Sequence, residues 1–191
     1  MNLTIKQWSE INENELDILS SLIRQSAEQF YDLIPEEEDI SELIRESMRN
    51  TESDLYDCIA IMNDEKIIGA LSFYATQELQ GRFLYYMRKI SDRNFHGNLM
   101  KYFKSIPSII SEGSYLSRIA VIDDCKGSGA AAKVLSLFES ISKEKGQKNA
   151  FLHVHVENKR AIKFYKNNSY KILTSTFDED THQYHLMTKA L

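Results

Sequence analysis

The spacing of hydrophobic residues predicts an alternation of strands and helices along most of the chain. Leu3 and Ile5 alternate with polar residues, as in a short half-buried strand. Leu16, Leu19 and Ile23 then recur at the three- and four-residue spacing of one helix face. The elements expected in the first 75 residues are a strand at 3–7, helices at 12–34 and 39–50, and a hairpin of strands at 56–62 and 66–75.

The second half continues this alternation after a stretch that is harder to interpret. Residues 77–114 are rich in Tyr, Phe, Arg and Lys, and only 95–106 show a helical pattern, so we interpret them as an irregular insertion with a local helix. The later elements expected are strands at 115–122, 150–156, 170–175 and 183–188, and helices at 131–146 and 158–165. This order predicts a single α/β domain over residues 1–191, with a mixed central sheet of about six to seven strands flanked by helices.

Composition and charge narrow the class of protein. The chain has 191 residues, 42% of them hydrophobic, which is enough for one packed domain. The formal net charge of -5 argues against a generally basic nucleic-acid binder. Residues 1–57 carry a net charge of -11 and residues 58–191 a net charge of +6. Either the acidic segment only keeps the protein in solution, or the two segments meet ligands of opposite charge.

Cysteine content and the N-terminal sequence indicate a reducing compartment. Cys58 and Cys125 have neither disulfide-framework nor zinc-site spacing, and we interpret both as small hydrophobic residues. The N-terminus lacks a basic segment followed by an apolar run, and no apolar stretch reaches the length of a membrane span. We therefore expect a cytoplasmic protein that binds neither membrane nor metal.

A glycine loop between a strand and a helix is the first feature that indicates a ligand-binding site. Residues 119–131 read IAVIDDCKGSGAA, and the glycines allow a tight turn whose N–H groups face outward at the start of the helix. Such a helix start attracts phosphate, and Lys126 adds a positive charge. A P-loop is excluded because its motif is absent. A dinucleotide loop matches by letter, with Glu157 as a ribose partner, although 123–126 separate the strand from the glycines.

A second segment, 152–170, adds a strand, an Asn helix cap and a short helix that ends in Phe164-Tyr165. With both segments in view, the chain resembles the GNAT family of acetyl-CoA-dependent N-acetyltransferases. Lys126-x-x-Gly129-x-Ala131 stands where that family has R/Q-x-x-G-x-G/A, and Asn158-x-x-Ala161-x-x-Phe164-Tyr165 matches its N-x-x-A-x-x-L/F-Y motif. Lys126 in place of Arg or Gln keeps the charge but loses the fork of donors, and 168–169 lack the family's usual Gly.

The resemblance implies an enzyme that uses acetyl-CoA as co-substrate, without a metal, to acetylate a small-molecule or peptide amine. It also implies that Tyr165 is catalytic and protonates the CoA thiolate, with direct attack by the amine. Family members are often homodimers. By the same resemblance, the residues expected to bind the cofactor are Ile119, Ala120, Val121, Lys126, Gly127, Ser128, Gly129, Ala130, Ala131, Asn158, Ala161, Phe164 and Tyr165.

The sequence leaves the general base and the acceptor open. The candidates for the base are Glu112, Glu157, His153 and His155, or a water held by Ser114, Tyr115 or Ser117. Two other functions also stay open, a non-catalytic acyl-CoA-binding module of the same fold and a dinucleotide-binding protein. The acidic helices and the 77–114 insertion occupy the positions where the family builds acceptor pockets, so a polycationic acceptor would be more sensitive to salt than a neutral one.

Overall fold

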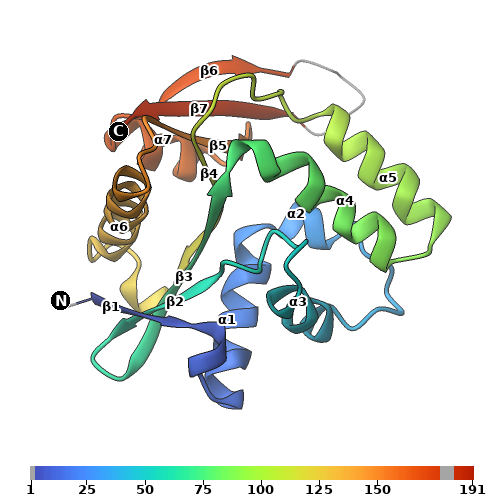
Figure 1. Cartoon of the computed structure of the whole chain (residues 1–191), viewed down its shortest axis with the longest axis horizontal. Helices are drawn as coiled ribbons and strands as arrows, with labels where there is room; N and C mark the ends of the chain where they lie inside the picture. The colour runs from blue at the N-terminus through green and yellow to red at the C-terminus, as the bar shows by residue number, and fades with distance from the viewer. Residues whose placement is uncertain (1–2, 177–182) are drawn as a thin grey trace.

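The computed structural model describes residues 3–176 and 183–191 and is built on a seven-stranded mixed sheet (Figure 1). The strand order is β1-β2-β3-β4-β5-β7-β6. Only the β4–β5 pair is parallel, and the other neighbours are antiparallel. The strands are β1 Leu3–Gln7, β2 Ile59–Asn63, β3 Lys66–Ala75, β4 Ser114–Val121, β5 Asn149–His155, β6 Lys171–Ser175 and β7 Tyr184–Ala190. The predicted α/β class with a mixed sheet is confirmed.

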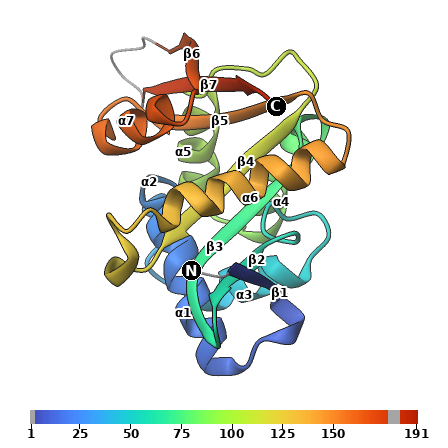
Figure 2. The same cartoon turned by 90° about the vertical axis from the view of Figure 1, so that its left-hand side faces the viewer.

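Helices cover both faces of this sheet (Figures 1 and 2). They are α1 Glu13–Ser26, α2 Glu28–Tyr31, α3 Ile40–Arg49, α4 Leu79–Lys89, α5 Arg93–Lys104, α6 Ala130–Glu144 and α7 Lys159–Asn167. Side chains of α1 to α5 form one apolar cluster with β2 and β3, whereas α6 and α7 form a second cluster on the opposite face. No helix within the described residues is long and apolar enough to cross a membrane.

Two helical segments differ from the sequence-based expectation. The helix expected at 12–34 breaks at Ala27, which has φ −148° and ψ 46°, and the chain continues as the short α2. The Ser26 hydroxyl donates to the Ile23 carbonyl at 2.6 Å, a local bond that competes with the helix. The segment expected to be irregular contains both α4 and α5, so only 105–113 connect α5 to β4 without regular structure. The α4 helix was missed because its apolar face is largely tyrosine.

The centre of the sheet opens between its two parallel strands. Pairing of β4 with β5 stops after Ser114–Ala150 and Tyr115–Phe151, although both strands continue. Beyond this point the strands diverge, and residues of both line a pocket. Backbone and side-chain groups in the middle of the molecule are thereby exposed to a ligand.

A bulge in β4 lies just past the last β4–β5 pair. Ser72 of β3 is opposite Arg118 and Phe73 is opposite Leu116, so Ser117 is an extra residue in β4. A bulge bends its strand and re-aims neighbouring side chains. Here the result is that Ser117 and Arg118 both contact the buried Asp54, from the loop between α3 and β2.

Candidate active site

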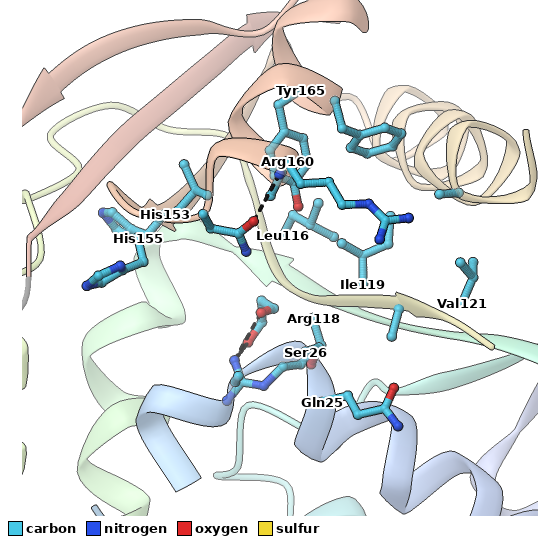
Figure 3. A pocket seen from close by; sticks show the side chains of 18 of the residues that line it. Gln25, Ser26, Leu116, Arg118, Ile119, Val121, His153, His155, Arg160 and Tyr165 are labelled. Atoms are coloured by element: carbon cyan, nitrogen blue, oxygen red, sulfur yellow. Dashed lines mark hydrogen bonds between the residues drawn. The ribbon is translucent and has the colours of Figure 1, made fainter. Parts of the chain in front are cut away.

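A pocket of about 630 Å³ lies between the diverging strands (Figure 3). Its walls come from β4 and β5, the loop before α6, the start of α6, α7, and the C-terminal end of α1. The residues expected to bind the cofactor that line it are Ile119, Ala120, Val121, Lys126, Gly127, Gly129, Ala131, Asn158, Ala161, Phe164 and Tyr165. The tertiary structure thus brings together two motifs that lie about thirty residues apart in the sequence.

Two residues that were expected to bind the cofactor, Ser128 and Ala130, are not part of the pocket wall. The Ser128 hydroxyl donates to the Cys125 carbonyl at 2.7 Å, which holds this side chain within its own turn. Ala130 is fully buried in the apolar cluster beneath α6. Neither side chain lines the pocket among the described residues, so any part that these two residues play in binding would involve the backbone.

The glycine loop has the backbone form that an anion site requires. Gly127 and Gly129 have φ of +82° and +86°, in the left-handed region that side chains other than glycine rarely adopt. Gly129 is the N-cap of α6 and offers no side-chain cap to the first N–H groups of the helix. A Cβ at either glycine would meet no atom within 4 Å, so both face open space. The Ser128 hydroxyl accepts from the Ala130 N–H at 3.3 Å, so the donors that the first turn of α6 presents at the pocket wall are the N–H groups of Ala131 and Ala132.

The charge of Lys126 is shared with a neighbour. Its ammonium group forms an ion pair with Asp123 on the preceding turn, and both side chains are largely exposed. This contact lowers the pKa of the Asp123 carboxyl, with a smaller contribution from Arg160. Arg160 also lines the pocket, at the start of α7. The positive charges near the glycine loop therefore come from the loop itself, through Lys126, and from α7, through Arg160.

Asn158 and Tyr165 are held by α7. The Asn158 side-chain oxygen accepts from the Ala161 N–H at 3.0 Å, which confirms the predicted helix cap. Figure 3 shows the Tyr165 side chain descending from α7 toward β4. The Tyr165 ring packs against Phe164 and Tyr170 and is only 8% exposed. Burial raises the pKa of the Tyr165 hydroxyl, so this group stays protonated throughout the neutral range.

The remaining wall comes from residues that the sequence-based site did not include. They include Gln25, Ser26, Gln29 and Phe30 around the α1–α2 break, Phe83 of α4, Tyr102 of α5, Arg118 of β4, Arg160 of α7 and Tyr184 of β7. These residues are polar, aromatic or basic. Most are far apart in sequence and belong to no motif, so only the fold brings them together.

The acidic residues of α1 lie away from the pocket. Glu13 and Asp17 pair with Arg45 of α3, and Glu15 pairs with Lys6 of β1. These acidic residues lie in the first half of α1, whereas its last turn lines the pocket, which at 1.5 Å per residue puts about 12 Å or more between their backbone positions and Gln25. These carboxylates therefore stabilise the helix layer, and the structure gives no support to the idea that they receive a cationic amine.

Two of the candidate bases also lie outside the pocket wall. Glu112 is exposed in the connection before β4, and Glu157 is exposed and faces Lys159 at 3.5 Å. His153 and His155 both line the pocket from β5. Among the described residues that line it there is no Asp or Glu.

His153 is expected to make stability depend on pH. Burial lowers the pKa of its imidazole to about 4, although the Pro107 carbonyl opposes this shift. An unfolded chain, with an ordinary pKa near ~6.5, binds a proton first as pH falls, so acid favours unfolding. Between pH 7 and pH 5 we expect this residue to account for about 2 kcal/mol of lost stability, measured by urea denaturation. A His153→Gln variant with an equally steep loss of stability would contradict this expectation.

Comparisons with known proteins agree with this geometry. The sequence model of the acetyltransferase (GNAT) family matches residues 19–170. No curated protein sequence matches the chain. An N-acetyltransferase from Staphylococcus aureus Mu50 has a similar fold, with a TM-score of 0.68 and 17% sequence identity over 97% of this chain and 100% of that one. A PaiA N-acetyltransferase from Thermoplasma acidophilum in complex with coenzyme A has a TM-score of 0.55 and 19% identity, with 100% of each chain covered. A mutant agmatine N-acetyltransferase in its apo form has a TM-score of 0.64 and 10% identity, also with 100% of each chain covered.

Identities this low show a shared fold and no more. The family model is stronger evidence, because it covers most of the chain. The match includes the glycine loop and α7 and ends at Tyr170, directly before β6. The order of the strands, the divergence of β4 from β5 and the helix that begins at the glycine loop are all consistent with it. The chain belongs to the GNAT family of acetyltransferases.

Proposed function

We propose that this protein transfers the acetyl group of acetyl-CoA to a primary amine by direct attack, and that Tyr165 protonates the departing thiolate. The observation that carries the proposal is one pocket whose wall includes both the first turn of α6 and Tyr165. A phosphate-binding end and a proton donor therefore share a single cavity. The reaction class is supported by membership of the family.

The residues present fit CoA. Unsatisfied N–H groups after Gly129 suit the pyrophosphate, and Lys126 and Arg160 add positive charge nearby. Beyond Tyr115, the edge of β4 that faces β5 has no β5 partner, so Ile119 and Val121 can offer backbone groups to the amides of the pantetheine arm. When bound, acetyl-CoA supplies the acetyl group as a thioester. Tyr165 then holds a proton for the sulfur, as an acid that burial keeps neutral.

The acceptor that fits best is a small amine or a peptide amine. Outside the glycine loop and α6, the pocket wall contains uncharged polar and aromatic side chains such as Gln25, Gln29, Phe30 and Tyr184, together with Arg118, which is paired with Asp54. These can accept or donate hydrogen bonds and can pack against an apolar amine. The agmatine N-acetyltransferase of similar fold acts, by its name, on a small amine. A cytoplasmic location and a homodimer remain part of this proposal.

A paired binding and turnover experiment tests the function. CoA is expected to raise the melting temperature of the protein and NAD(P) is not, because only CoA matches both the loop and the β4–β5 opening. Thiol release from acetyl-CoA is then measured with small amines and peptides. Stabilisation by CoA without release on any amine would favour the non-catalytic acyl-CoA-binding module. Stabilisation by NAD(P) alone would favour the dinucleotide-binding alternative.

The glycine loop provides a specific binding prediction. Gly129→Ala forces a side chain into a left-handed conformation at φ +86° and places a methyl group at the wall of the anion site. We expect CoA affinity to fall by about tenfold or more, which corresponds to about 1.4 kcal/mol. Gly81→Ala is the matched control, because this helix residue has an ordinary φ and an added Cβ meets nothing. Equal CoA affinities for the two variants, measured by calorimetry, would contradict the loop assignment.

A further inference from the structure

Tyr115 and His153 meet where the two parallel strands begin to diverge. The Tyr115 hydroxyl lies 3.0 Å from Nδ1 of His153, and their ring centroids are 5.5 Å apart. Tyr115 belongs to the last β4–β5 pair, and His153 follows its partner Phe151 by two residues. Both side chains line the pocket. The pair therefore lies in the pocket wall at the point where β4 and β5 begin to diverge.

The Pro107 carbonyl sets the direction of the two hydrogen bonds that His153 makes, one to Pro107 and one to Tyr115. Nε2 of His153 lies 2.7 Å from the Pro107 carbonyl oxygen, which only accepts, so Nε2 carries the proton. A neutral imidazole has one N–H, so Nδ1 accepts, and the Tyr115 hydroxyl must donate to it. With its one proton committed, the Tyr115 oxygen has only lone pairs left for the pocket. It therefore suits an N–H donor such as an amine.

We propose that Tyr115 accepts the proton of the attacking amine while passing its own proton to His153. This inference rests on the proposed acetyl transfer. The amine nitrogen forms the C–N bond to the acetyl carbon, and the C–S bond breaks with its electron pair on sulfur, which Tyr165 protonates. The amine N–H proton moves to the Tyr115 oxygen, and the Tyr115 proton moves to Nδ1 of His153. Tyr115 ends neutral, His153 ends as an imidazolium bonded to Pro107, and exchange with water resets both His153 and Tyr165.

The surroundings of the pair favour a relay over a free tyrosinate. Burial and the neighbouring hydroxyls of Tyr74 and Tyr102 raise the pKa of Tyr115 well above its usual value, and the Asp54 carboxylate adds to this while Arg118 opposes it. Tyr115 thus loses its proton only as it gains another. Burial lowers the pKa of His153 to about 4, which leaves the Nδ1 lone pair free at neutral pH but also weakens the imidazole as a base. The Pro107 carbonyl is the group that stabilises its cation.

The other β5 histidine is arranged differently. Nδ1 of His155 accepts from the Glu157 N–H at 3.3 Å, and its ring packs edge-on against Tyr184. The Tyr115 hydroxyl contacts the ring of His153, so the β4–β5 relay runs through His153. His155 nevertheless lines the pocket, which makes it the rival that the experiment has to separate from His153.

Conservative variants test the relay. Tyr115→Phe removes the accepting oxygen, and His153→Gln keeps a donor for Pro107 and an acceptor for Tyr115 but cannot hold a second proton. We expect each to lower kcat by about 10²-fold or more at pH 7, with CoA affinity within twofold of wild type and with the double variant no worse than the worse single one. The control is His185→Gln, which alters a β7 histidine whose Nδ1 lies 2.6 Å from the Ser175 hydroxyl outside the pocket. It should keep kcat within about threefold.

A spectroscopic readout separates the relay from a structural role and from failure of the proposed function. Nitrogen chemical shifts of His153 are expected to report an Nε2–H tautomer that stays neutral from pH 8 to pH 5 in the wild type. In Tyr115→Phe the Pro107 carbonyl still holds that tautomer, and the Nδ1 shift is expected to move to that of a nitrogen without a hydrogen bond. An Nδ1–H tautomer, or His153→Gln keeping a third of wild-type kcat, overturns the relay alone. A loss confined to His155→Gln also overturns it. Absence of turnover by the wild type with every amine overturns both the relay and the transfer.

Discussion

Replacing Tyr165 by Phe is expected to lower kcat by about 10²- to 10⁴-fold while CoA affinity stays unchanged. The change removes only a hydroxyl, so the buried ring keeps its contacts with Phe164 and Tyr170. In the proposed mechanism the thiolate then has no proton donor as the C–S bond breaks, so the barrier is expected to rise. The measurement is thiol release under saturating acetyl-CoA, together with CoA binding by calorimetry.

Tyr170→Phe is the matched control for this experiment. Tyr170 is also buried, its ring lies 5.7 Å from that of Tyr165, and it is not part of the pocket wall. We expect its kcat to stay within about threefold of wild type, because only the hydroxyl of Tyr165 is in the pocket. If Tyr165→Phe keeps more than a third of wild-type kcat, Tyr165 is not the acid. If both variants lose kcat equally, the loss reflects packing.

Removing the Asp54 carboxylate is expected to cost about 3–5 kcal/mol of folding stability, because it leaves the buried Arg118 cation without its counter-charge. Asp54 is completely buried, and one of its oxygens lies 2.8 Å from Nη2 of Arg118. The same oxygen accepts from the Ser117 hydroxyl at 3.0 Å, and the other accepts from the Tyr86 hydroxyl at 2.9 Å. Burial alone would lower the pKa of Arg118, but Asp54 raises it well above its usual value.

Urea denaturation of Asp54→Ala measures this cost. The control is Glu52→Ala, two residues earlier, which breaks an exposed ion pair with Arg88 and should change stability by less than about 1 kcal/mol. Asp54→Ala/Arg118→Met removes both charges and should regain part of the loss. A loss below 1 kcal/mol in Asp54→Ala, or no recovery in the double variant, would show that the pair does not carry this stability.

The Asp54 network also links stability to the geometry of the pocket. Arg118 donates to both the carbonyl and the hydroxyl of Ser117, the extra residue of the β4 bulge. The Ser72 hydroxyl of β3 donates to the Asp54 carbonyl at 2.6 Å. The network therefore fixes the bulge from both sides, next to the point where β4 leaves β5. A protein weakened at Asp54 should lose kcat as well as stability, because the bulge and the neighbouring Tyr115 would no longer be held in place.

The sequence by itself determined the order of elements and the two motifs. The sequence pattern predicted the ends of β1 and of β3 to β7 to within two residues, whereas β2 begins three residues later than expected. Asn158 and Gly129 mark the starts of α7 and α6 in the structure. These features depend on neighbours within a few positions, such as a cap, a turn or one apolar face. For the same reason the family motifs could name in advance most of the pocket-lining residues that are proposed to bind the cofactor.

Only the tertiary structure decided which residues outside the two motifs line the pocket and which buried groups support them. Asp54 meets Arg118 across 64 positions, and Pro107 meets His153 across 46, because sheet order and the β4 bulge bring them together. No local pattern encodes such contacts, since each depends on a strand register set elsewhere. The break at Ala27, which turns the last residues of α1 toward the pocket, and the distance of the acidic helix start from it also emerged only from packing.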